Sequence, residues 1–225
     1  MELLAKPSKQ ATEVRRAGLV VAALRLAAHR NPADITTADL ARTVGITQGA
    51  VFRHFASKEA IWLTVLDWTT DTLLAQLRHA AAGHDEVPLP PLQALQAIFV
   101  AHVDFVTTHP GVPRVIFQEL QHAQETPLKA RVRGLMQQYR TLVMDMLQRA
   151  QAQNLLVAGT DIHAAAVLFL GAVQGLVLQA LFSGQVQSMS VQAPAVFAIY
   201  LRGIATQQTL PFITHSATHT RESTT

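Results

Sequence analysis

The chain has 225 residues, of which 49% are hydrophobic and 15% charged, and its formal net charge is +3. This apolar content excludes a wholly disordered chain, and the length suits one large or two small globular domains. Cysteine is absent, which excludes disulfides and thiolate metal sites and fits a reducing compartment. The first ten residues lack the apolar core of a signal peptide, so we expect a cytoplasmic protein.

Basic residues are concentrated at one end of the chain. Up to Lys58 there are nine Lys or Arg against four Asp or Glu, and the remainder is slightly acidic. A basic end on a nearly neutral body predicts a polyanionic partner for that end alone.

The first fifty-odd residues, in chain order, predict a loose basic arm over 1–10 and then helices. Apolar residues at Val14, Ala17, Val21, Leu24 and Ala28 form one stripe, which predicts a helix from about Ala11 to Arg30 that ends at Asn31-Pro32. Thr36 is then a natural N-cap, and Asp39 three residues later completes a capping box.

Residues 37–56 read TADLARTVGITQGAVFRHFA and predict two short helices joined by a tight turn. Ala41 is small enough for a close helix crossing, Gly45 tolerates a positive φ in the turn, and Val51 fills the corner. The second segment, Thr47 to His54, has an outward face that is short, polar and basic. That face is typical of a helix that enters a DNA major groove, although two surface helices joined by a glycine turn would show the same spacing.

The rest of the chain also predicts helices. Ser57 caps a long helix that runs to about Ala82, and residues 83–91, with three prolines, form a linker. The expected elements that follow are helices over 92–109, 115–123, 127–154, 162–182 and 194–208, and then a disordered polar tail over 210–225. We therefore expect an all-α fold in two domains, a small one over 11–82 and a larger one over 92–209.

The run RTVGITQGAVFRHFASKEAIW, after a helix start with two threonines, resembles the DNA-binding domain of the TetR family of transcriptional regulators. The resemblance covers Val14 to Leu66. Phe52 stands where the family usually has a tyrosine whose hydroxyl contacts a phosphate, so packing or a thymine methyl contact is expected for it instead. The family's first helix also usually ends in phenylalanine and glycine, which this chain lacks.

The resemblance implies DNA contacts around the second short helix. The residues expected to bind bases or phosphates are Thr36, Thr37, Thr47, Gln48, Gly49, Ala50, Phe52, Arg53, His54 and Lys58. Base contacts are expected from Thr47, Gln48, Gly49 and Arg53, of which Gln48 can pair bidentately with adenine and Arg53 with guanine. Phosphate binding is expected from Thr36, Thr37, His54 and Lys58.

Residues 164–182, AAAVLFLGAVQGLVLQALF, are long and apolar enough for a membrane span. Gln174 and Gln179 would then lie in lipid, and no Lys or Arg flanks the run closely. A helix buried on one side by its own domain and on the other by a partner explains the same pattern, with Gly171 and Gly175 allowing close approach. Because the last two long helices form the dimer interface in the family, we expect a homodimer and no membrane insertion.

The resemblance also implies a small-molecule pocket in the larger domain. Candidate lining residues are His102, Phe105, Phe117, Gln121, Met136, Tyr139, Met144, Phe169 and Gln174, and the scarcity of acids favours a neutral, largely apolar ligand. The expected function is a homodimeric repressor that a ligand releases from a roughly palindromic operator.

Two other functions remain open. Glu119 and His122 form an E-x-x-H pair, as in di-iron helical bundles, so a metal enzyme is the alternative. The chain lacks the second such pair, and we expect no metal, no cofactor and no catalytic residues. A dimeric helical interaction protein that does not bind DNA is the third possibility.

Overall fold

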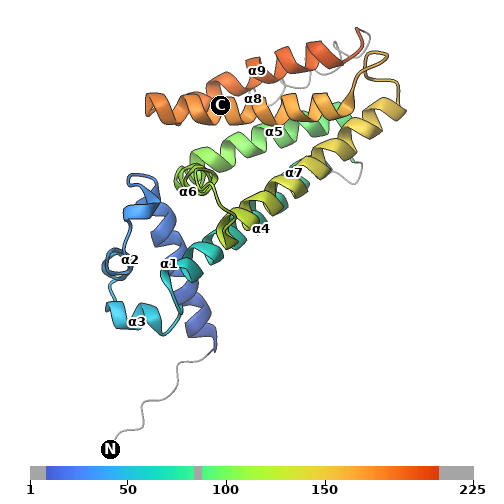
Figure 1. Cartoon of the computed structure of the whole chain (residues 1–225). Helices are drawn as coiled ribbons and strands as arrows, with labels where there is room; N and C mark the ends of the chain where they lie inside the picture. Colours follow the sequence, from blue (N-terminus) through green and yellow to red (C-terminus); the bar gives the residue numbers. More distant parts are fainter. Residues whose placement is uncertain (1–8, 84–87, 208–225) are drawn as a thin grey trace, which may run out of the picture. The chain divides into compact units, whose positions relative to one another are not determined.

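The structure, a computed structural model, describes residues 9–83 and 88–207 (Figure 1). Within these ranges the chain is all-helical, and its one β-type contact is an isolated bridge between Leu156 and Ala205. The expected arm over 1–10 and tail over 210–225 lie almost wholly outside the described residues, as do positions 84–87 of the linker. The elements are α1 (Lys9–Ala27), η1 (Pro32–Asp34), α2 (Thr37–Thr43), α3 (Gln48–Phe52), α4 (Lys58–Ala82), α5 (Pro91–Thr108), α6 (Gly111–Leu120), α7 (Pro127–Ala152), α8 (Ile162–Ser183) and α9 (Ser188–Ile204).

The described residues form two compact units, and neither is one continuous segment. Unit 1 consists of residues 9–72 and 109–135, and unit 2 consists of residues 73–83, 88–108 and 136–207. Helix α6 and the first residues of α7 therefore belong with α1 to α3. The division into domains 11–82 and 92–209 is a division along the sequence and stays a prediction.

The core face of α1 differs from the predicted stripe. Val14 and Val21 are 68% and 60% exposed, whereas Leu24 is buried as the stripe predicts, together with Leu19 and Val20, which the stripe did not include. The predicted stripe and the observed buried residues both repeat at helical spacing, but they are rotated about the helix axis relative to each other. Periodicity alone therefore does not decide which of them packs inward. The helix also ends at Ala27 instead of Arg30.

Helix α6 begins at Gly111, not near Val115, and meets α1 closely. A Cβ at Gly111 would lie 2.1 Å from the carbonyl oxygen of Leu24, so only glycine fits this contact. Pro113 lies in the first turn of α6, where backbone N–H groups have no partner within the helix and a proline is tolerated. The expected helix over 115–123 was wrong at its start, because it left Pro113 outside the helix.

Unit 2 is built around an aromatic core in which α5, α8 and α9 pack together. Phe99 from α5 lies 5.4 Å from both Phe169 of α8 and Phe197 of α9, measured between ring centroids. The Tyr200 hydroxyl donates to the carbonyl of Ala165 at 3.1 Å, which ties α9 to α8. Helix α9 starts at Ser188, six residues before the predicted start, and contains Pro194 in its interior. Pro194 is exposed, so the Ser190 carbonyl that loses its helical partner can be solvated.

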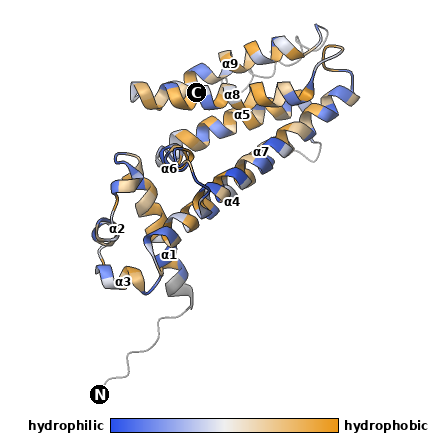
Figure 2. Ribbon diagram, in the orientation of Figure 1, coloured by the Kyte–Doolittle hydropathy of each residue, from blue (hydrophilic) through white to orange (hydrophobic). Residues whose placement is uncertain are grey.

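The outward faces of α8 and α9 are apolar. Exposed side chains there include Val167 (56%), Leu168 (57%) and Phe182 (80%) on α8, and Val191 (81%) and Ile199 (64%) on α9. Figure 2 shows both helices largely in the orange of hydrophobic residues. Among the described residues, α8 is the one helix whose length and composition would allow a membrane crossing, a property that core helices of soluble proteins share.

Candidate nucleic-acid interface

Helices α2 and α3 form the predicted helix-turn-helix. Gly45 has φ of +69° in the turn, and Ala41 and Val51 are 3% and 0% exposed at the crossing. The capping box at the start of α2 is present: the Thr36 hydroxyl accepts from the Asp39 amide, and the Asp39 carboxylate accepts from the Thr36 amide. These three predictions are confirmed, and together they fix where α3 lies against α2.

The outward side of α3 presents most of the predicted base-reading residues. Thr47 is the N-cap and accepts from the Ala50 amide, while Gln48, Gly49 and Arg53 are exposed. Phe52 is 48% exposed, so one side of its ring faces solvent. The α-helical part covers only Gln48–Phe52, because Arg53 is the C-cap and His54 follows it.

One side-chain hydrogen bond joins the two helices across the motif. The Gln48 amide nitrogen donates to the Thr37 hydroxyl at 2.7 Å. Thr37 is only 9% exposed, so its hydroxyl positions Gln48 and offers little surface of its own. The sequence did not predict this bond: Gln48 was expected to contact a base and Thr37 a phosphate.

The predicted phosphate-binding residues differ in their exposure and in the hydrogen bonds that they already make within the chain. Thr36 is exposed, but its amide and hydroxyl both donate to Asp39. The Lys58 ammonium donates to the carbonyl of Ala33 at 2.7 Å and is half-buried. Nδ1 of His54 is buried without a hydrogen-bond partner in the described chain, which leaves Nε2 as the ring atom able to reach outward.

Asp39 is held as a carboxylate. Hydrogen bonds from the backbone and side chain of Thr36, together with Arg30 at 3.2 Å, keep the pKa of Asp39 well below its usual range. The cap is therefore ionised at neutral pH, and Arg30 links the end of α1 to the start of α2.

The candidate ligand-binding residues are divided between the two units. In unit 2, Nδ1 of His102 lies 3.0 Å from the Tyr139 hydroxyl, and the Tyr139 and Phe169 rings are 6.4 Å apart. Met136 and Gln174 also approach each other, at 3.9 Å between sulfur and amide nitrogen. Phe105 is buried in the same unit, Met144 is partly buried, and Gln174 is exposed. Phe117 and Gln121 belong to unit 1, so the list does not describe one site.

Burial shapes the electrostatics of the polar pair in unit 2. It lowers the pKa of His102 to about 4 and raises the pKa of Tyr139 far above its ordinary value. Both groups are therefore neutral at pH 7. A neutral pair suits an apolar surrounding, where a charge would be costly.

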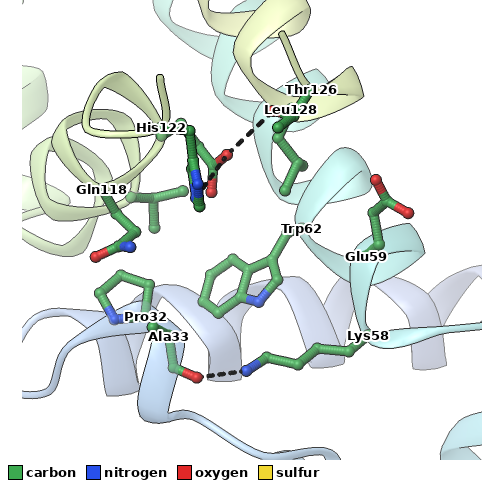
Figure 3. A pocket seen from close by; sticks show the side chains of 11 residues that line it. Pro32, Ala33, Lys58, Glu59, Trp62, Gln118, His122, Thr126 and Leu128 are labelled. Atoms are coloured by element: carbon green, nitrogen blue, oxygen red, sulfur yellow. Dashed lines mark hydrogen bonds and ion pairs between the residues drawn. The ribbon is translucent and has the colours of Figure 1, made fainter. Parts of the chain in front are cut away.

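In the part of the chain that the structure describes, Glu119 and His122 do not lie among the further His, Asp or Glu side chains that a metal enzyme would need. Glu119 lies 3.9 Å from His122 and 3.5 Å from the Thr126 hydroxyl, beside a pocket of about 360 Å³ within unit 1 (Figure 3). In the described ranges no three His, Asp or Glu side chains are grouped to hold a metal ion. Residues from η1, α4, α6 and α7 line this pocket, and sequence spacing alone did not bring them together.

Two family models match the chain. Residues 19–65 match the one described as "Bacterial regulatory proteins, tetR family", and residues 88–178 match "Tetracyclin repressor-like, C-terminal domain". The first covers the second half of α1, all of α2 and α3 and the beginning of α4, and the second covers α5 to most of α8.

Curated relatives are distant. The nucleoid occlusion factor SlmA of Haemophilus ducreyi is 26% identical over 130 residues, which is 58% of this chain and 62% of the relative. SlmA of Vibrio cholerae is 22% identical over 150 residues, 67% of this chain and 74% of the relative. The aligned part of the chain thus spans about three fifths of the length of the first of these.

Solved structures share the fold over most of their length. The ketosteroid transcriptional regulator KstR2 of Mycobacterium tuberculosis has a TM-score of 0.69 at 24% identity, with 86% of this chain and 96% of that chain covered. FadR of Bacillus subtilis, in complex with stearoyl-CoA, has a TM-score of 0.72 at 14% identity, covering 83% and 98%.

Proposed function

The chain belongs to the TetR family of DNA-binding transcriptional regulators, which are not enzymes, and from this premise we propose that it is a homodimeric repressor that leaves its operator when a small molecule binds. The observation that carries the proposal is the outward face of α3, with Gln48, Gly49 and Arg53 exposed beside a rigid turn. Such a face fits a major groove.

Gly49 supports close approach to DNA. A Cβ built at this position meets nothing within 4 Å, so packing inside the chain does not require glycine there. The space that glycine leaves open lies outward, where a DNA backbone or base edge would come near. We assign base contacts to Thr47, Gln48, Gly49 and Arg53, and phosphate contacts to Thr36, His54 and Lys58.

The apolar face of α8 and α9 supports a homodimer. These two helices expose large apolar side chains, which a second copy would cover; they include Val167, Leu168, Phe182, Val191 and Ile199. Two heads in one dimer would read a roughly palindromic operator. An intracellular location follows from a DNA partner.

Unit 2 supports a neutral, largely apolar ligand. Its aromatic core holds His102 and Tyr139 as neutral groups, and the buried acid among the described residues, Glu119, belongs to unit 1. One solved neighbour is a ketosteroid regulator and another is in complex with stearoyl-CoA, in which the stearoyl chain is apolar and the coenzyme A part is anionic, so only the steroid fits a neutral ligand as a whole. Such a ligand would release DNA only by binding the released state more tightly.

Selection from a random DNA pool with the purified protein, at two salt concentrations, tests the proposal. We expect an inverted repeat to be enriched and its affinity to fall with salt. Lys58→Ala should weaken all sites alike and lower the salt slope by about one. Binding that is weak and blind to sequence at both salt concentrations would overturn the DNA-reading role.

A further inference from the structure

The pocket in unit 1 has no role in the proposed repression. It lies where η1 and the start of α4 face the end of α6 and the start of α7, and its volume is about 360 Å³, at the small end of ligand pockets. Figure 3 shows the indole of Trp62 at its centre, with Pro32 and Gln118 to one side and Leu128 above. Most of the surface that lines it is apolar, although polar side chains also contribute, among them Glu119.

Glu119 is the unusual group in this lining. The residue is 8% exposed, and its Oε2 atom receives a long contact from Thr126 at 3.5 Å and lies 3.9 Å from His122. Across the described chain, Oε1 of Glu119 accepts no hydrogen bond. The contacts from Thr126 and His122 are long, and Oε1 is not sealed inside the described chain, so the carboxylate is open to a closer donor from a molecule in the pocket.

The other charges around the pocket favour a cation there. Glu59 adds a second carboxylate to the lining, and the Lys58 ammonium is engaged with the Ala33 carbonyl at 2.7 Å. An aromatic face such as that of Trp62 also attracts cations.

We propose that this pocket binds a small organic cation, with its ammonium group at the Glu119 carboxylate and its apolar body against Trp62. The Gln118 amide and the Thr126 hydroxyl also line the pocket and would complete the ammonium's hydrogen bonds. An anion is disfavoured because it would face Glu119 and Glu59 at once. The site is separate from the neutral pair in unit 2.

Protonation of Glu119 competes with such a ligand. Burial raises the pKa of Glu119, with Glu59 adding to the effect and His122 and Thr126 opposing it. A proton and an organic cation are alternative ways to neutralise this carboxylate. Affinity for the cation therefore falls as the pH is lowered.

Calorimetry with the free full-length protein tests the site, using three probes of similar size. These are 2-phenylethylammonium, the neutral 2-phenylethanol and the anion 3-phenylpropionate. We expect the ammonium to bind at least tenfold more tightly than the other two. Equal binding of the three, tighter binding of the anion, or no saturable binding of the ammonium overturns the proposal.

Two variants locate the binding. Glu119→Gln keeps the shape of the side chain and should weaken ammonium binding at least tenfold. Glu125→Gln is the matched control, since Glu125 lies between α6 and α7, pairs with Arg133 at 2.6 Å and does not line the pocket. Wild-type affinity in Glu119→Gln, with a native circular dichroism spectrum, contradicts the assignment.

The two tryptophans give a second readout. The indole N–H resonance of Trp62 should shift on titration with 2-phenylethylammonium and that of Trp68 should not, with Trp68→Phe used to assign them. A shift of Trp68 alone places the ligand elsewhere and overturns the proposal. All these measurements omit DNA, so their outcome is independent of whether α3 reads an operator.

Discussion

Units 1 and 2 arrange polar and apolar groups in opposite ways. In unit 1 the outward side of α3 carries polar residues such as Gln48 beside the half-exposed ring of Phe52, and the buried groups beneath them are Ala41 and Val51. In unit 2 a neutral His102–Tyr139 pair lies inside, and apolar side chains such as Leu168 cover the outward face of α8. The difference indicates two kinds of partner, because a polar outward face suits nucleic acid and an apolar one suits protein.

The largest effect is expected from making the α8 face polar. In a symmetric dimer, Leu168→Glu would bury two unpaired carboxylates, one from each copy, at a cost of about 4 kcal/mol. The dissociation constant of the dimer should therefore rise about a thousandfold. Analytical ultracentrifugation measures it. Gln148→Glu, which adds the same charge at an exposed position of α7, should leave the dimer intact; dissociation in both variants, or in neither, would remove the basis for the interface.

The interior of unit 2 should lose stability in acid. Burial lowers the pKa of His102 from its ordinary 6.5 to about 4, so between these pH values the unfolded chain binds a proton that the folded chain does not. Stability is full above pH 6.5 and falls by about 3 kcal/mol as the pH drops to 4. Urea unfolding at pH 7 and pH 4 should show this loss reduced in His102→Gln and unchanged in His163→Gln, a substitution at an exposed histidine of α8.

The polar face of α3 should respond to loss of one base-reading group. Arg53→Ala is expected to weaken operator binding by about 2 kcal/mol and to relax the preference at one base pair in each half-site. Fluorescence anisotropy with the selected operator and single-base variants measures both. Arg140→Ala removes the same charge from exposed α7 and serves as the control; equal losses in the two variants would mean that Arg53 acts only through net charge.

The smallest effect concerns the turn beneath that face. Gly45→Ala meets no atom within 4 Å but must hold φ at +69°, so it should destabilise the fold by about 1 kcal/mol. Gly18→Ala, in the exposed interior of α1 with equal room, should stabilise it by about 0.5 kcal/mol. Paired urea titrations check the opposite signs, and a shared sign would contradict the strain argument.

Local chemistry made part of unit 1 predictable from sequence. The capping box of Thr36 and Asp39, the Gly45 turn and the Ser57 cap all depend on residues within a few positions of one another, and the structure has each of them. The buried side of α1 was not predictable in this way, because Val14 and Val21 fit the same period as the residues that pack.

Long-range packing explains what sequence reasoning missed. Trp62 and Glu119 share a pocket although 57 positions separate them, and no spacing rule connects such residues. The E-x-x-H pattern did single out Glu119 and His122, but for metal chemistry. Pro194 was expected to begin a helix, and only its exposure in α9 shows how the preceding turn tolerates it.

The bond from Gln48 to Thr37 limits how freely this motif can be re-engineered. Because the side chain at position 48 is oriented by a hydroxyl on the preceding helix, α3 is not a self-contained cassette. Grafting Thr47–Arg53 onto a scaffold without that threonine would transfer the sequence of α3 but not the side-chain conformation of Gln48. A designer who wishes to rewrite the specificity of this protein has to exchange positions 37 and 48 together.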